Sequence, residues 1–223
     1  MLRVKQVSPT NATTPPPRPR RDASRTRTAI LDAAEELFAE RGYEAVSLSE
    51  VGEAAGVSRG TPGYFFGNKE GLYRAVLDRT ISDSQGLVDR MREASLAGAS
   101  ADQIVEEAIS GYIDLLARRP SYVRLIQWET LKGGRFLGQA VPHVTAMEGA
   151  LEMLNELTKG LGEARPDPVH LLISILGLCW FPFAHADGAL RTLGLEARDA
   201  AFIAERKRHV VEVVRRAMGL ESA

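Results

Sequence analysis

The sequence has a single cysteine, Cys179, and no apolar run long enough to span a membrane. A single cysteine cannot form a disulfide bond within the chain. The cysteine content therefore gives no sign of a protein that is stabilised by disulfides in an oxidising compartment. The longest apolar run, over residues 171–183, is shorter than the roughly 20 residues that a spanning helix needs and is interrupted by Ser174 and Pro182. No apolar secretory segment opens the chain. We therefore expect a cytoplasmic protein that does not associate with membranes.

Aromatic residues are also scarce, at 6% of the chain, but the rest of the composition is that of a globular protein. Hydrophobic residues make up 44%, charged residues make up 26%, and the mean hydropathy is -0.14, which excludes disorder along the whole chain. A length of 223 residues accommodates one or two domains with a sizeable core. The four histidines are scattered without the spacing of a metal site, so neither a metal nor another cofactor is expected.

The net charge of -1 is unevenly distributed, because the N-terminal end of the chain is basic and the remainder is acidic. Residues 1–28 contain seven Lys or Arg residues and one acid, a net charge of +6, whereas the remaining chain contains 21 basic and 28 acidic residues, a net charge of -7. Residues 1–22 are rich in Pro, Thr and Arg without hydrophobic periodicity, which predicts a disordered basic arm. Such an asymmetry favours contact with a polyanion, although a solvated tail without a partner has the same composition.

Beyond the arm, hydrophobic residues recur at helical spacing, and strand-like alternation is absent. Pro120 separates two of the helices, and side-chain caps mark the starts of others: Ser47 or Ser49 for the second helix, Asn68 for the fourth, and Asp167 followed by Pro168 for the eighth. We expect nine helices: one over about residues 24–41, a short one ended by Gly56, a short one from Ser58 to about Phe66, a fourth that begins after Asn68, a fifth through residues 104–116, a sixth through residues 123–128, a seventh over 142–161, an eighth from 168 onward and a ninth over 196–218. The sequence therefore predicts an all-α protein with a small head over residues 23–79 and a larger helical body over residues 80–223.

The segment from Ser47 to Leu72, SLSEVGEAAGVSRGTPGYFFGNKEGL, carries the most informative pattern. Two short helices are joined by a turn in which Gly56 permits a positive φ, Val57 faces the core and Ser58 caps the second helix. This is the layout of a helix-turn-helix, whose second helix presents its N-terminal side chains to the major groove of DNA. Ser58 also completes a G-x-S-x-G hydrolase motif, but that motif needs a preceding strand, and the residues before Gly56 have a helical pattern.

The stretch from Thr28 to Leu77 resembles the DNA-binding region of the TetR family of transcriptional regulators, through its ILDAAEELFAERGYEAVSLSEV lead-in and its AGVSRGTPGYFFGNKEGL core. The resemblance implies that residues at the entries of both short helices lie against DNA and that a lysine at the start of the fourth helix contacts phosphate. The implied residues are Ser47, Ser49, Arg59, Gly60, Thr61 and Lys69. Arg59 can form a bidentate hydrogen bond with guanine or an ion pair with phosphate. Thr61 can contact a thymine methyl group or a phosphate.

The chain departs from the family pattern inside the second of these helices. Pro62, Gly63 and Tyr64 stand where the family commonly has leucine, tyrosine and histidine. As the fourth helical residue, Pro62 would forfeit the first intrahelical hydrogen bond, and Gly63 lacks the aromatic hydroxyl that the family uses on phosphate. We expect Tyr64 and Phe65 to take over that contact, while Phe66 packs inward. Gly63, Tyr64 and Phe65 complete the predicted DNA-binding set.

The resemblance also implies a ligand-binding and dimerisation domain in the body. We expect a small-molecule pocket lined by aromatic residues with polar groups, namely Tyr112, Trp128 and Trp180. The eighth helix is apolar nearly all the way round, which predicts a homodimer interface formed by the last two helices, with Val210 and Val214 at the interface. Burial of both helices in the chain's own core is the alternative.

Together these features predict a sequence-specific DNA-binding transcriptional regulator. We expect a ligand-responsive repressor that acts as a homodimer on a palindromic operator in double-stranded DNA. Its effector would be an unidentified small molecule, and no enzymatic activity is expected. The alternative from another class is a helical interaction or structural protein that does not bind DNA. Salt-dependent binding to duplex DNA separates the two.

Overall fold

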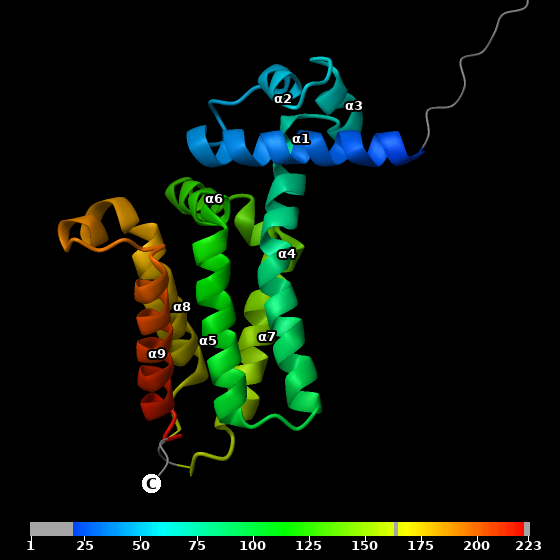
Figure 1. Cartoon of the computed structure of the whole chain (residues 1–223). Helices are drawn as coiled ribbons and strands as arrows, with labels where there is room; N and C mark the ends of the chain where they lie inside the picture. Colours follow the sequence, from blue (N-terminus) through cyan, green and yellow to red (C-terminus); the bar gives the residue numbers. More distant parts are fainter. Residues whose placement is uncertain (1–19, 163–164, 221–223) are drawn as a thin grey trace, which may run out of the picture.

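The computed structural model describes residues 20–162 and 165–220, which form helices and connecting turns without a β-strand. The all-α prediction is therefore confirmed for this part of the chain. Figure 1 shows short helices and one long crosswise helix forming a head at the top, and long helices running side by side below it as a body. The predicted basic arm, residues 1–22, lies outside the described residues except for residues 20–22, which are helical. Within the described ranges, no helix is long and apolar enough to cross a membrane.

The head consists of α1 (Arg20–Arg41), α2 (Leu48–Ala54), α3 (Thr61–Phe66) and the first turns of α4 (Lys69–Leu96). Helix α1 begins four residues before its predicted start and ends at the predicted residue. Its apolar stripe includes Ile30 and Phe38, which are fully buried in one cluster with Val51 of α2 and Leu72 of α4. The head is thus held together by the stripe that the sequence pattern indicates.

Helix α4 belongs to both parts of the molecule. It is continuous over 28 residues, and Asn68 caps its start as predicted, accepting a hydrogen bond from the Gly71 N–H at 2.8 Å. Near its start Leu72 is buried in the head, whereas Leu87 and Met91 further along are buried in the body. The boundary proposed between residues 79 and 80 falls inside this helix. A change in the position of α4 within the body therefore moves the head as well.

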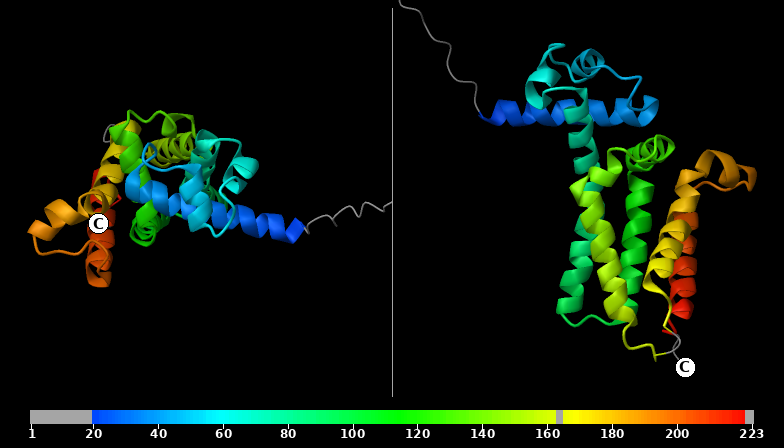
Figure 2. Two further views of the ribbon diagram at one scale, coloured as in Figure 1. Left: turned by 90° about the horizontal axis from the view of Figure 1, so that it is seen from above. Right: turned by 180° about the vertical axis from the view of Figure 1, so that it is seen from behind.

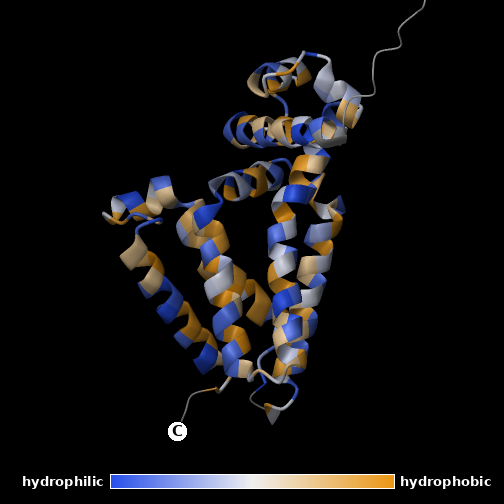
Figure 3. Cartoon of the chain, turned by 45° about the vertical axis from the view of Figure 1, so that its right-hand side comes forward, coloured by the Kyte–Doolittle hydropathy of each residue, from blue (hydrophilic) through white to orange (hydrophobic). Residues whose placement is uncertain are grey.

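The body is a bundle of α4, α5, α7, α8 and α9. The shorter helix α6 lies between this bundle and the head (Figures 1 and 2). The body helices are α5 (Ala101–Arg118), α6 (Pro120–Leu131), α7 (Val141–Thr158), α8 (Pro168–Ala184) and α9 (Ala200–Ala217). The sequence predicts neither the 3₁₀ turn η1 (Leu137–Gln139) nor the π-helical turn η3 (Ala186–Leu190). Figure 3 shows hydrophobic residues along the length of the bundle helices, which accounts for their packing.

Helix α8 contains a proline, Pro182, close to its C-terminal end. Proline has no N–H, so the carbonyl of Leu178, one turn earlier, lacks its usual helical donor. Arg206 of α9 supplies a replacement, since its Nε lies 3.2 Å and its Nη2 lies 2.5 Å from the Leu178 carbonyl oxygen. The proline thus leaves an acceptor through which α9 is attached to α8.

Replacing Arg206 by Met is expected to lower the free energy of unfolding by about 1–2 kcal/mol, because the Leu178 carbonyl loses its donor. In a Pro182→Ala background the alanine N–H can bond to the same carbonyl, so the cost of Arg206→Met should fall by about half or more. Urea unfolding of the four proteins measures this coupling. An equal cost in both backgrounds would contradict the assignment.

Helices α8 and α9 differ in how much of their apolar surface the chain itself covers. Val210 and Val214 of α9 are fully buried within the chain, where α9 packs against α5, so the prediction that these two residues face a second subunit is wrong. A hydrophobic stripe has the same spacing whether its partner belongs to the same chain or to another. Helix α8 leaves Val169, Ile173 and Phe181 exposed. Apolar surface available to a partner therefore lies on α8.

Candidate nucleic-acid interface

Ser47 begins the helix-turn-helix as the N-cap of α2. Its hydroxyl oxygen accepts a hydrogen bond from the Glu50 N–H at 3.2 Å, and the Glu50 carboxylate accepts one from the Ser47 N–H at 2.8 Å. The Ser47 hydroxyl also donates to that carboxylate at 2.7 Å, and these bonds lower the pKa of Glu50. Ser49, which the sequence also offers as a cap, is half-buried in the first turn. A reciprocal pair therefore fixes the start of α2.

The turn after α2 has the conformation that the sequence predicts. Gly56 has a φ of +68°, and Val57 packs against the core. Gly52 of α2 has a role that the pattern does not indicate. A Cβ at this position would lie 3.0 Å from the Ser58 carbonyl oxygen and 3.1 Å from the Arg59 Cα. The absence of a side chain thus lets α2 and the turn approach each other closely.

Helix α3 begins later than predicted. Its N-cap is Gly60 and its first residue is Thr61, so the prediction that Ser58 caps it is wrong. Ser58 instead closes a turn, in which its carbonyl accepts from the Thr61 N–H at 2.9 Å and the two hydroxyls bond at 2.7 Å. Pro62 becomes the second helical residue, where an N–H has no partner within the helix. The predicted loss of a hydrogen bond at Pro62 is therefore also wrong.

The outer face of α3 lies at the top of the head, on the side away from the body (Figure 1). Tyr64 of α3 is 86% exposed, and its ring meets that of Phe65 edge-on with centroids 5.5 Å apart. The other predicted residues of this segment are exposed (Arg59, Gly60) or half-buried (Thr61, Gly63). Helix α3 itself has no charged residue. Its polar contacts to base edges can therefore come only from the hydroxyl groups of Thr61 and Tyr64 and from the backbone.

Cations flank α3 instead of lying on it. The Lys69 ammonium donates to the Glu44 carbonyl at 3.0 Å and lies 4.5 Å from the centroid of the Tyr43 ring. An ammonium has three donors, so two are left for phosphate. On the other side, the guanidinium of Arg27 lies 5.0 Å from the centroid of Phe66, whose ring packs against the core as predicted. The sequence gives no sign of the Arg27 contact, because the two residues are far apart in the chain.

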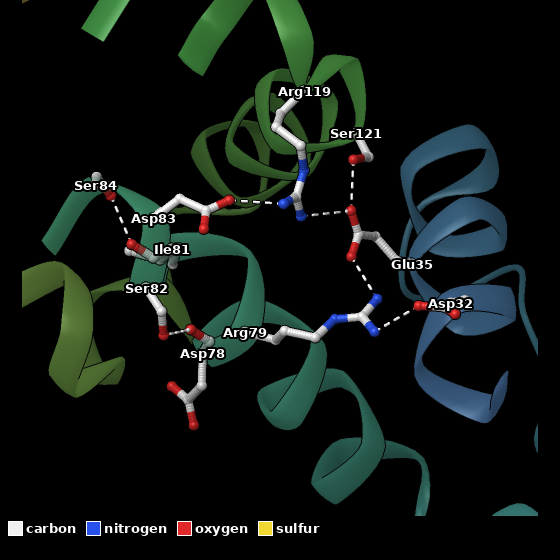
Figure 4. A network of polar contacts seen from close by, with 10 residues as sticks. All are labelled: Asp32, Glu35, Asp78, Arg79, Ile81, Ser82, Asp83, Ser84, Arg119 and Ser121. Carbon is white, nitrogen blue, oxygen red and sulfur yellow. Dashed lines mark hydrogen bonds and ion pairs between the residues drawn. The ribbon is translucent and has the colours of Figure 1, made fainter. Parts of the chain in front are cut away.

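A buried carboxylate links the head to the body (Figure 4). Glu35 of α1 is 7% exposed, and it accepts hydrogen bonds from Arg79 of α4 at 2.6 Å, Arg119 at 3.1 Å and Ser121 of α6 at 2.6 Å. Each arginine also pairs with a second carboxylate at 2.6 Å: Arg79 with Asp32, and Arg119 with Asp83. Burial alone would raise the pKa of Glu35, but the hydrogen bonds and charges of its partners hold this pKa below its ordinary value. We call these six residues the Glu35 network.

A second contact between head and body involves two consecutive residues of α6. The Trp128 ring lies against Gly42, where a Cβ would come within 3.0 Å of it, and its Nε1 donates to the Ala39 carbonyl at 3.2 Å. Glu129 is buried and accepts from the Tyr73 hydroxyl at 2.9 Å and from two backbone N–H groups at 2.9 and 3.0 Å. Trp128 therefore covers the end of α1 and borders a hollow at this junction, apart from the cavity of the body.

The body contains an apolar cavity of about 90 Å³ between α4, α5, α7 and α8. Of the three predicted pocket residues, Tyr112 of α5 lies in its wall. Trp180 of α8 packs edge-on against Tyr122, with ring centroids 6.1 Å apart, and Trp128 lies at the head. Aromatic side chains fill cores as readily as they line pockets, so the sequence cannot separate these roles. In the described ranges, no group of three or more His, Cys, Asp or Glu residues is arranged to hold a metal ion.

Two family profiles match the chain. The profile "Bacterial regulatory proteins, tetR family" matches residues 30–76, and "Tetracyclin repressor-like, C-terminal domain" matches residues 102–214, about half of the chain. The HTH-type transcriptional repressor ComR of Escherichia coli is 43% identical over 94 residues, which cover 41% of this chain and 40% of ComR. The HTH-type transcriptional activator FasR of Mycolicibacterium smegmatis is 33% identical over 100 residues, which cover 45% of this chain and 44% of FasR. The chain therefore spans less than half the length of these relatives.

Solved structures share the fold over most of the chain. A TetR-like transcriptional regulator from Rhodococcus sp. RHA1 has a TM-score of 0.65 at 16% identity, covering 88% of this chain and 97% of that one. FadR from Bacillus subtilis, solved in complex with stearoyl-CoA, has a TM-score of 0.62 at 22% identity, covering 84% of this chain and 96% of that one. At these identities the likeness concerns the fold alone.

Proposed function

The chain belongs to the TetR family of bacterial regulatory proteins, and we propose that it binds double-stranded DNA as a sequence-specific transcriptional regulator. The exposed outer face of α3, carried by a capped helix-turn-helix, is the observation that supports this proposal. Thr61 and Tyr64 offer hydroxyl groups to base edges, and Arg59 and Lys69 offer cations to guanine or phosphate. The proposed contact set also includes Ser47, Ser49, Gly60, Gly63 and Phe65.

The basic end of the chain extends this proposed contact. Helix α1 begins at Arg20, and its first turns project beyond α3 in Figure 1. Arg25 and Arg27 are exposed on this projecting end. A basic segment here can follow the phosphates or enter the adjacent minor groove.

We propose that the protein is a homodimer in which α8 and α9 of two subunits form a four-helix interface. Val169, Ile173 and Phe181 give α8 an exposed apolar surface of the kind that marks interfaces in soluble proteins. A Cβ at Gly177 of α8 would meet no atom within 4 Å, which leaves room for a second helix to approach closely. Two-fold symmetry of the dimer would be matched by an operator with two inverted half-sites.

We propose further that an effector in the body cavity lowers the affinity for DNA, so that the protein is a repressor released by its ligand. Helix α4 supports this mechanism, because it forms part of the cavity wall and also packs in the head. A ligand that binds better to one arrangement of α4 shifts the population toward it, by its differential affinity for the two arrangements.

Selection of duplexes from a random pool by the full chain tests the proposed function. The expected product is an inverted repeat whose half-sites are about 10 base pairs apart, centre to centre, or a small multiple of that spacing. Its affinity should fall steeply as salt rises. A reporter gene behind this sequence should be expressed less when the protein is present. Absence of enrichment and of salt-dependent binding would favour a helical interaction protein instead.

Replacing Lys69 by Met is expected to weaken binding to all duplexes alike, by about tenfold, because the side chain holds a phosphate and does not read bases. Methionine keeps most of the packing over Tyr43 while removing the charge. The slope of log K against log salt should become shallower by about one unit. Fluorescence anisotropy with specific and scrambled duplexes measures both quantities.

The matched control is Lys159→Met, which removes an exposed lysine at the end of α7, far from the head. It should leave DNA affinity and the salt slope unchanged. A loss confined to the selected operator, with scrambled duplexes bound as before, would count against a phosphate contact at Lys69.

A further inference from the structure

The cavity of the body is walled almost entirely by hydrocarbon. Among its lining residues, only Ser84 of α4 and Tyr112 of α5 carry a polar group. The Ser84 hydroxyl donates to the Ile81 carbonyl at 2.6 Å, so its hydrogen is already engaged. Burial raises the pKa of the Tyr112 phenol well above its ordinary value, so this group is neutral at physiological pH. The lining therefore carries no charge.

This lining disfavours a charged occupant. An ionised carboxylate or ammonium that leaves water pays a large desolvation penalty unless an opposite charge or several hydrogen bonds meet it. The cavity offers neither. An apolar molecule, in contrast, gains by moving from water onto the same surface. The chemistry of the wall thus selects for ligands without charge.

The size of the cavity limits what enters without rearrangement. At about 90 Å³ it is smaller than the roughly 150 Å³ that accommodates a benzene ring in a protein core. Three flexible side chains in the wall, Met91, Met147 and Met153, can adopt other rotamers to make space. The cavity can therefore adapt to a larger molecule at these positions.

The helices around the cavity are closely packed. A Cβ at Gly149 of α7 would lie 2.7 Å from the Val88 Cγ1 of α4, and one at Gly111 of α5 would lie 2.6 Å from the Leu87 Cδ1. Val88 and Leu87 also line the cavity. Helix α4 is thus held between α5 and α7 without spare room at these two points. A molecule that outgrows the cavity must displace the methionines or α4 itself.

We propose that the effector is an uncharged, largely apolar small molecule that occupies this cavity and enlarges it at the methionine side chains and at α4. The inference rests on the proposed function, since it names the class of that effector. It disfavours organic acids and lipophilic cations whose charged group would be buried in the cavity, because none of the lining residues carries a charge to neutralise them.

Three probes with the same hydrocarbon chain test the class: 1-hexanol, hexanoate and hexylamine, which are neutral, anionic and cationic at neutral pH. With the full chain and without DNA, 1-hexanol is expected to raise the melting temperature saturably, by about 5 °C well above its Kd. Hexanoate and hexylamine should leave it unchanged. Because no DNA is present, failure here overturns the effector class and leaves the duplex selection and the Lys69 experiment as separate tests of DNA binding.

A cavity-filling variant shows where the probe binds. Ala150→Leu on α7 adds three carbon atoms to the cavity wall and should abolish the response to 1-hexanol. Ala108→Leu on α5 makes the same change from the opposite side, for use if the first variant does not fold. Ala97→Leu at the exposed C-terminal end of α4 is the matched control and should respond fully. The proposal is overturned if 1-hexanol gives no shift, if a charged probe gives an equal one, or if the filled cavity still responds.

Discussion

A chain with Ile173→Glu and Phe181→Glu is expected to be monomeric and to bind its operator at least about 100-fold more weakly than the unaltered protein, because each subunit then holds a single half-site. Both residues lie on α8 and are 59% and 50% exposed, so a glutamate at either position meets water in the monomer. Across a two-fold axis the same glutamates would face one another or an apolar surface, which disfavours association.

Analytical sedimentation measures whether the variant is a monomer, and a binding assay with the operator measures its affinity. The matched control is Leu96→Glu, which adds a glutamate at an exposed apolar residue at the far end of α4. It should remain a dimer and keep its affinity. Glutamate at Val210 or Val214 would not serve as a test, because these residues are buried inside the chain and the variant would unfold. A double α8 variant that stays dimeric with full affinity would rule out this interface.

Replacing Glu35 by Ala is expected to lower the free energy of unfolding by about 2–3 kcal/mol near neutral pH, because two arginines lose the carboxylate between them. The estimate lies below the full cost of breaking a buried pair, since the side chains of Arg79 and Arg119 are 30% and 34% exposed and keep their second partners. Glu35→Gln keeps the shape and an acceptor for Ser121, so it should lose less.

The effect of Glu35 should depend on pH with a definite sign. Its pKa is lower in the folded protein than in the unfolded chain, so its ionised form stabilises the fold above the unfolded pKa. That contribution is lost as the pH falls through the folded pKa. The gap between the wild type and Glu35→Gln in urea unfolding should thus be largest above about pH 5 and shrink toward about pH 3. A gap that is constant over this range would show that charge is not the cause.

Local signals in the sequence are enough to predict several helix starts, although α9 begins at Ala200, four residues after its predicted start. Ser47, Asn68 and Asp167 cap their helices through hydrogen bonds to residues two or three positions ahead, and such bonds need no other part of the chain. The same reasoning fails at Ser58, because Ser58 and Thr61 form a turn of their own that delays α3 until Pro62 can occupy its second position. Ser58 can either cap a helix or form a turn with Thr61, and the spacing of the residues does not show which conformation is more stable.

Contacts between distant residues had no counterpart in the sequence pattern. Glu35 is separated by 44, 84 and 86 positions from its three partners, and no periodicity relates them. Trp128 illustrates a different limit, because an aromatic ring with a polar group suits a ligand pocket and a helix end equally well. The residues proposed to contact DNA follow from the family resemblance, which carries information that the spacing of residues does not.

Because α4 is one unbroken helix, a tilt of its body end is transmitted to the head. At 1.5 Å per residue its 28 residues make a rod about 42 Å long. A tilt of about 5° around its far end moves its near end by nearly 4 Å, and in a two-fold dimer the second head moves by the same amount in the opposite sense. The distance between the two recognition helices then changes by up to about 7 Å, roughly two base-pair steps of 3.4 Å each. A rearrangement no wider than one methionine side chain is thus enough to take both heads out of register with successive major grooves.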